Sequence, residues 1–139
     1  MSRRKRYLRN LGRTLPEPLA LRTTTAWIRF EHESEPYGVF SYISDVRPKL
    51  STSEEEELDE ILDWFYDELD APDDGLDHER FWFRAEAEVC VEQARRLAEL
   101  VRGTGIPIVE RRTDRVPGKI KWEDPDQVAV LTYRDAPRP

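Results

Sequence analysis

The clearest periodic pattern in the chain is that of an amphipathic helix over residues 53–70. Its apolar positions fall within an arc of roughly 100° on a helical wheel, so they predict a face that packs on the core. These positions are Leu58, Ile61, Leu62, Phe65 and Leu69. Trp64 lies off this face, which favours an exposed contact surface there. Pro72 and Gly75 predict that the helix stops near Asp70.

The start of this helix carries two overlapping capping boxes, Thr52 with Glu55 and Ser53 with Glu56. Acidic residues also crowd its first turn, where the helix dipole stabilises negative charge. Both features predict that the helix begins at residue 53 or 54, directly after an N-cap at Thr52 or Ser53.

A second amphipathic helix is predicted over residues 85–102, with Cys90 on its apolar side and a stop at Gly103–Gly105. Short runs of β-branched and aromatic residues predict strands elsewhere. The strands are expected at residues 23–31, 37–43, 79–83, 106–112, 119–122 and 127–133. The first two form a hairpin, and residues 79–83 occupy the centre of the sheet. A Pro117–Gly118 turn joins strands 106–112 and 119–122 into another hairpin.

This order of elements, ββαβαβββ, predicts an α+β fold in which two helices pack on a mainly antiparallel sheet as a two-layer sandwich. The 139 residues, 38% of them hydrophobic, suffice for one domain, which we place at residues 21–134. Residues 1–20 are expected to be an extended or partly disordered arm and residues 135–139 a flexible tail.

Several protein classes are excluded by composition. The chain contains no run of about 18 apolar residues, so the sequence predicts no membrane span. No apolar segment resembles a secretory signal. We therefore expect a cytoplasmic protein. The six glycines form no phosphate-binding loop, and the single cysteine excludes a disulfide framework or a thiolate zinc site. We expect no cofactor, and we expect Cys90 to be buried and unreactive.

Charge is divided unevenly along the chain. Residues 1–22 hold seven basic residues against one acid, a charge of +6, so a net charge of −7 leaves −13 on the rest. A basic tail on an acidic body is typical of an arm that binds nucleic acid. Its candidate phosphate contacts are Arg3, Arg4, Lys5, Arg6, Arg9 and Arg13. Alternatively, the arm packs on the acidic helix of its own or a neighbouring subunit.

The acidic half of this pattern lies between Lys49 and Arg80, where fourteen Asp and Glu residues occur without one Lys or Arg. Like charges repel along a helix face, which favours a partner with a basic surface; the arm of a second subunit is one alternative for that partner. The candidate contact residues are Glu56, Glu60, Asp63, Trp64 and Asp67.

A smaller basic group surrounds the predicted Pro117–Gly118 hairpin. It consists of Arg111, Arg112, Arg115, Lys119 and Lys121. Together with the arm it predicts a discontinuous phosphate-binding surface; the alternative is an ordinary solvated hairpin face.

A carboxylate group near the last turn is the best candidate for an enzyme. Divalent-metal nucleases gather such acids at strand ends. The acids are Glu123, Asp124 and Asp126, with Asp114 and Glu110 on the preceding strand. Asp124–Asp126 also fits a tight turn, and we favour the turn and expect no metal. His32 and His78 show no ligand spacing and are interpreted as loop residues.

Residues 50–132 resemble small uncharacterised bacterial α+β proteins. The similar segments are residues 62–65, 82–87, 97–100, 105–108, 117–120 and 122–124. The resemblance implies no activity, cofactor or site residue.

The sequence therefore predicts a non-enzymatic accessory or adaptor protein that binds nucleic acid, or a complex associated with it, through the arm and a protein through the acidic helix. Two alternatives stay open: an inhibitor or immunity-type protein whose acidic helix mimics phosphate, and a small metal-dependent hydrolase.

Overall fold

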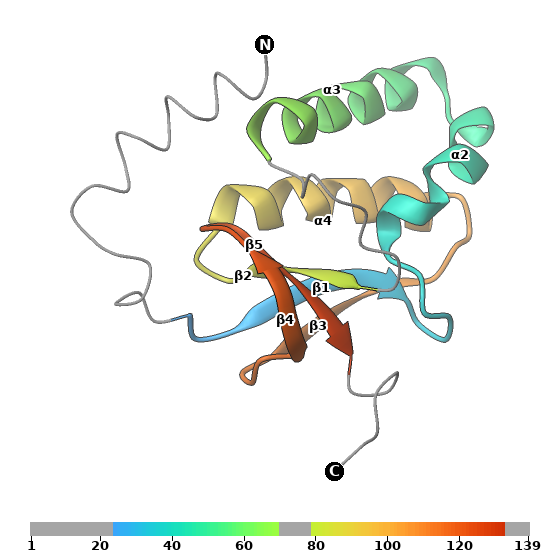
Figure 1. The fold of residues 1–139 in the computed structure, drawn as a ribbon. Coiled ribbons are helices and arrows are strands. Elements are labelled where there is room, and N and C mark those ends of the chain that lie inside the picture. Colours follow the sequence, from blue (N-terminus) through green and yellow to red (C-terminus); the bar gives the residue numbers. More distant parts are fainter. Residues whose placement is uncertain (1–23, 70–78, 133–139) are drawn as a thin grey trace.

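A computed structural model describes residues 24–69 and 79–132. It contains a five-stranded antiparallel sheet in the order β3-β1-β2-β5-β4, with its helices on one face (Figure 1). The strands are β1 (Trp27–His32), β2 (Arg80–Arg84), β3 (Ile108–Thr113), β4 (Gly118–Glu123) and β5 (Gln127–Thr132). The helices are α2 (Ile43–Val46), α3 (Thr52–Glu68) and α4 (Glu88–Gly103), with 3-10 turns η2 (Val39–Tyr42) and η3 (Arg47–Lys49). The predicted α+β class is confirmed, as is the central position of β2.

Helix α3 begins one residue earlier than its predicted boxes imply. Ser51 is the N-cap, its hydroxyl accepts from the backbone N–H of Glu54, and the Glu54 carboxylate accepts from the N–H of Ser51. The boxes expected at Thr52 and Ser53 are therefore wrong. Leu50 and Ser51 both have an extended backbone, and the helix begins at Thr52. An N-cap residue has this extended conformation, so Ser51 takes that position.

Trp64 is not the exposed residue that the helical wheel predicts. It is half-buried against the main core, and its ring meets the Phe65 ring edge-on with centroids 5.1 Å apart. Trp64 lies on the side of α3 that also carries Glu57 and Glu60, whose carboxylates bind Arg96 of α4. Packing on α4 therefore widens the buried sector of α3 beyond the predicted face.

The expected strand at residues 37–43 is wrong. Only one bridge, Glu31 to Gly38, continues the pairing beyond β1, and the chain then turns through η2 into α2. Val39 and Val46 are both buried, and Ile43 packs on the same core. Their spacing of four and three residues is that of a helix face, which outweighs the β-branched and aromatic composition.

The predicted hairpin at Pro117–Gly118 is also wrong, because β3 and β4 form opposite edges of the sheet. β3 pairs only with β1, and β4 pairs only with β5. Five residue steps from Thr113 to Gly118 span at most about 18 Å, whereas four strand spacings in a flat sheet need about 19 Å. The sheet must therefore coil, and Figure 1 shows β4 and β5 crossing the direction of β1 steeply.

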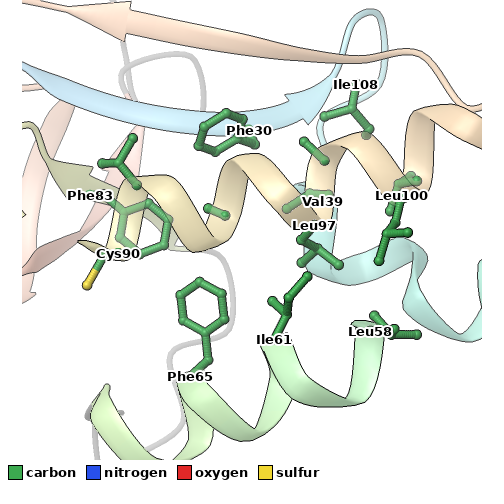
Figure 2. Packing of buried hydrophobic residues seen from close by; sticks show 14 of the residues in the cluster. Phe30, Val39, Leu58, Ile61, Phe65, Phe83, Cys90, Leu97, Leu100 and Ile108 are labelled. Carbon is green, nitrogen blue, oxygen red and sulfur yellow. The ribbon is translucent and has the colours of Figure 1, made fainter. Parts of the chain in front are cut away.

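The main core lies between the sheet and the helices. Figure 2 shows Phe65 pointing from α3 towards Phe83 of β2, with Phe30, Leu97 and Ile61 nearby. Cys90 is buried in this core, as predicted. A second cluster of Trp27, Val128 and Val130, with Trp82 against it, lies apart from the main core. Trp27 alternates with Ile28 of the main core along β1, so the sheet buries side chains on both faces.

Candidate binding sites

Two arginines from neighbouring elements bind four carboxylates of α3. The pairs are Arg47 with Glu55 (3.4 Å) and Asp59 (2.9 Å), and Arg96 with Glu57 (3.4 Å) and Glu60 (3.1 Å). The hydrogen bond to Asp59 raises the pKa of Arg47, and the one to Glu60 raises the pKa of Arg96. The chain itself therefore offsets part of the repulsion that the sequence analysis ascribed to a missing partner.

An acidic stripe remains on the outer face of α3, which we define as Glu56, Asp63 and Asp67 with Tyr66 beside them. These positions lie opposite the buried Leu58, Ile61 and Phe65 on the helix. Within residues 24–69 and 79–132, no basic side chain contacts the three carboxylates. Tyr66 is 77% exposed, the most exposed large apolar side chain in the described chain. Glu60 continues the stripe but is already bound by Arg96.

The predicted basic residues are dispersed rather than gathered. Arg111 lies on β3, where its guanidinium binds the Glu31 carboxylate at 3.0 Å. Arg112 is exposed on the same strand, whereas Lys119 and Lys121 are exposed on β4 at the opposite edge. The hairpin face that was expected to unite them does not form. The six candidate residues of the arm, from Arg3 to Arg13, lie outside the described residues.

Asp124 is a turn residue, as favoured from the sequence. Its Oδ1 accepts the backbone N–H groups of Asp126 and Gln127 at 2.8 and 2.9 Å, and its own N–H donates to the Gln127 carbonyl. This arrangement closes the β4–β5 hairpin, and it occupies one oxygen of the carboxylate that a metal would need.

The other carboxylates of the enzyme hypothesis lie apart. Glu123 of β4 binds Arg84, while Glu110 of β3 binds Arg95 at 3.1 Å, so the two stand on opposite edges of the sheet. Across residues 24–69 and 79–132, no three His, Cys, Asp or Glu side chains are placed to hold a metal ion.

His32 closes the turn after β1. Its Nδ1 accepts the backbone N–H groups of Ser34 and Glu35 at 3.1 and 3.2 Å, so the turn uses this nitrogen as an acceptor. The ring lies 5.8 Å from that of Tyr42, whose hydroxyl donates to Glu35. His78 lies outside the described residues.

A cavity of about 410 Å³ opens between the sheet, η2 and the C-terminal end of α3. It lies where β1 and β2 part, since their ladder ends at the pair Ile28–Phe83. The Arg29 side chain crosses this gap: Nη1 donates to the Phe81 carbonyl at 3.0 Å, and Nε donates to Glu31 at 2.7 Å. An arginine thus bridges two strands at the point where backbone pairing stops.

The walls of the cavity are aromatic. They include Phe30, Phe40, Phe65, Phe81 and Phe83, together with Leu69. Arg29 is 9% exposed, and burial lowers the pKa of its guanidinium while Glu31 opposes that effect. No motif in the sequence predicts this site. Its one signal is a cation at the centre of the apolar strand Trp27–Phe30, where an unpaired charge is unfavourable.

Comparison with protein-family models, curated proteins and solved structures finds no match. The resemblance over residues 50–132 therefore stays a prediction. No helix in the part of the chain that the structure describes has the length and apolar character to span a bilayer.

Proposed function

We propose that this protein is a non-enzymatic adaptor. The acidic stripe of α3 binds a protein partner that presents a basic surface, and the basic arm binds nucleic acid or a complex that contains it. The observation that supports the first contact is the pairing pattern of α3, in which four acids have arginine partners and the outward-facing Glu56, Asp63 and Asp67 have none among the described residues.

The exposed aromatic residue beside these acids strengthens the proposal. Tyr66 follows Asp63 by three positions, so its ring lies next to the Asp63 carboxylate on the surface of the helix. Tyrosine is enriched at the centres of protein interfaces, where its ring contributes buried area and its hydroxyl a hydrogen bond. A ring flanked by unpaired acids suits a partner with lysines or arginines around an apolar contact.

Two matched sets of substitutions test the stripe. One set neutralises it with Glu56→Gln, Asp63→Asn and Asp67→Asn. The other removes three charges that the chain already pairs, with Glu55→Gln, Glu57→Gln and Asp59→Asn. Both raise the net charge by three, so any effect of the overall field acts on both alike.

The binding partner is first isolated from the native host with the full chain, with and without nuclease treatment, and then purified. We expect the stripe set to weaken its binding by at least about tenfold, mostly through slower association, with stability unchanged or slightly higher. The paired set should leave affinity nearly unchanged and lower stability by up to about 1 kcal/mol.

Equal losses of affinity in the two sets would show that binding depends only on the net charge of the protein. That result would overturn the stripe as a docking surface. A partner that nucleic acid displaces from the stripe would favour the phosphate-mimic function over the adaptor. Capture of a second copy of the chain would identify the partner as its own basic arm.

A further inference from the structure

We propose that the cavity at Arg29 is a binding site for a small organic anion, namely a monocarboxylate with an apolar body of about the size of a double ring. This ligand site is independent of the proposed adaptor surface, which lies on the opposite face of α3. The proposal rests on the free donors of Arg29, the charge around it, the aromatic walls and the position of Gly38.

Arg29 supplies the anion-binding group. Its Nε and one N–H of Nη1 are used by Glu31 and Phe81, whereas both N–H groups of Nη2 have no partner among the described residues. The side chain is nine-tenths buried and lines the cavity. Because hydrogen bonds between a guanidinium and a carboxylate are among the strong ones, a carboxylate oxygen at Nη2 would satisfy the remaining donors of Arg29.

The charge around the cavity selects a single negative charge. One carboxylate, Glu31, is shared between Arg29 and Arg111, at 2.7 and 3.0 Å. Glu79 lines the cavity, and Arg80 lies close enough to oppose the charge on Arg29. Among the residues that the structure describes, three arginines and two glutamates leave one net positive charge, which matches a carboxylate better than a doubly charged phosphate monoester.

The walls define the rest of the ligand. Phe65 and Phe83 stack with centroids 6.1 Å apart, and Phe40 meets Phe65 edge-on at 5.1 Å. Phe40 is 42% exposed, so it forms the rim through which a ligand enters. A volume of about 410 Å³ falls in the range of cavities that enclose small organic molecules, and such cavities are mostly apolar with a few polar groups that fix orientation.

Gly38 keeps the guanidinium uncovered. A Cβ at this position would lie 3.0 Å from Nη2 and 3.4 Å from Cζ of Arg29. The backbone of Gly38 has φ −76°, which any residue adopts, so an added methyl group would act through Arg29, whose guanidinium would have to move by a few tenths of an ångström.

The test uses 2-naphthoate and its uncharged analogue 2-naphthamide, titrated into the full chain by calorimetry. We expect naphthoate to bind at least about tenfold more tightly, since the two probes differ only in the group that faces Arg29. Arg29→Gln should abolish this preference, and Phe40→Ser should weaken both probes by a similar factor. Tyr66→Ser, which removes an exposed aromatic side chain outside the cavity, should leave the affinities for both probes unchanged.

Gly38→Ala keeps Arg29 and its ion pair with Glu31, so it carries the test if Arg29→Gln does not fold; it should weaken naphthoate more than naphthamide. Equal affinities for the two probes in the unaltered chain, a preference that survives Arg29→Gln or Gly38→Ala, or no binding of either probe at about 5 mM would each overturn the proposal. The stripe substitutions of α3 should leave these affinities unchanged, so the failure of one proposal is distinguishable from the failure of the other.

Discussion

Phe65 connects the parts of the main core. It is 7% exposed and contacts the rings of Phe40, Trp64 and Phe83, which come from η2, α3 and β2. Phe65→Ala should therefore lower the free energy of unfolding by about 3–5 kcal/mol, because it removes buried area and leaves a cavity between three elements. Tyr66→Ala, one position along the same helix but exposed, should cost less than about 0.5 kcal/mol.

Chemical denaturation of both variants measures these values. A loss of unfolding free energy below about 1 kcal/mol for Phe65→Ala would contradict the orientation of α3, because truncating a large residue on the core face of a small domain costs more than that.

Tyr42 carries the second prediction at this scale. Burial and then the hydrogen bond to Glu35 raise the pKa of Tyr42 from 10.0 to about 12. The fold favours the neutral hydroxyl, so its contribution to stability is fully present below pH 10 and is lost as the pH rises through about 12. In a titration followed by tyrosinate absorbance, Tyr42→Phe should remove a step with a midpoint at about pH 12, and Glu35→Gln should lower the midpoint of that step.

Single residues were predicted well where burial alone decides their environment, as for Cys90 and Phe65. They were predicted poorly where a distant segment decides it. Trp64 was expected to be exposed because a helical wheel contains no neighbouring helix. Arg29 was not recognised at all, since its partner Phe81 comes from β2, 52 positions away in the sequence, and Gly38 approaches it through the turn after β1.

At the scale of elements, the two long helices were predicted because their apolar period and their stop signals agree. The errors arose in short segments. Residues 37–43 have the composition of a strand, yet the buried positions Val39, Ile43 and Val46 follow a helical spacing. Pro117–Gly118 has the signature of a hairpin turn, but the strands on either side pair with different partners. Local signals specify a bend in the chain, and the pairing of strands depends on long-range packing.

The exposed lysines of β4 have a role that does not require a ligand. β4 is an edge strand, and Lys121 occupies the position where its register with β5 shifts, between Ile120 and Trp122. Lysines and bulges on an edge oppose pairing with the edge of another molecule. We therefore expect Lys119 and Lys121 to protect this edge from self-association.

Replacing both residues by valine should convert β4 into a regular edge that pairs with a second copy. We expect the double variant to elute as larger, concentration-dependent species in size-exclusion chromatography, with little loss of stability for the monomer. The control variant with both Lys119→Glu and Lys121→Glu keeps charge on the edge, so it should elute at the same volume as the unaltered chain. If the valine variant also behaves as the unaltered chain, the lysines do not guard the edge.

At the scale of the whole molecule, negative charge is distributed over the folded body in two ways. Part of it is neutralised by internal pairs that tie α3 to η3 and α4. The rest faces outward on α3, while the basic residues of β3 and β4 stand at separate edges of the sheet. The described body therefore presents no continuous basic face to a phosphate backbone, and we expect the arm to supply the contacts with nucleic acid.

This expectation defines a salt dependence. If Arg3, Arg4, Lys5, Arg6, Arg9 and Arg13 each neutralise one phosphate, a plot of log K against log salt has a slope of about −5 for duplex DNA and about −4 for a single strand, because each contact releases condensed counterions. Changing all six to glutamine should abolish measurable binding. A control with Arg111, Arg112, Lys119 and Lys121 changed to glutamine should keep the slope if the arm acts alone. If all four edge residues contact phosphates as well, the control should reduce the slope by about 4 for duplex DNA and about 3 for a single strand. Fluorescence anisotropy with a labelled oligonucleotide over a salt series measures each slope. A flat response, or unaltered binding by the arm variant, would show that nucleic acid is not the partner of the arm.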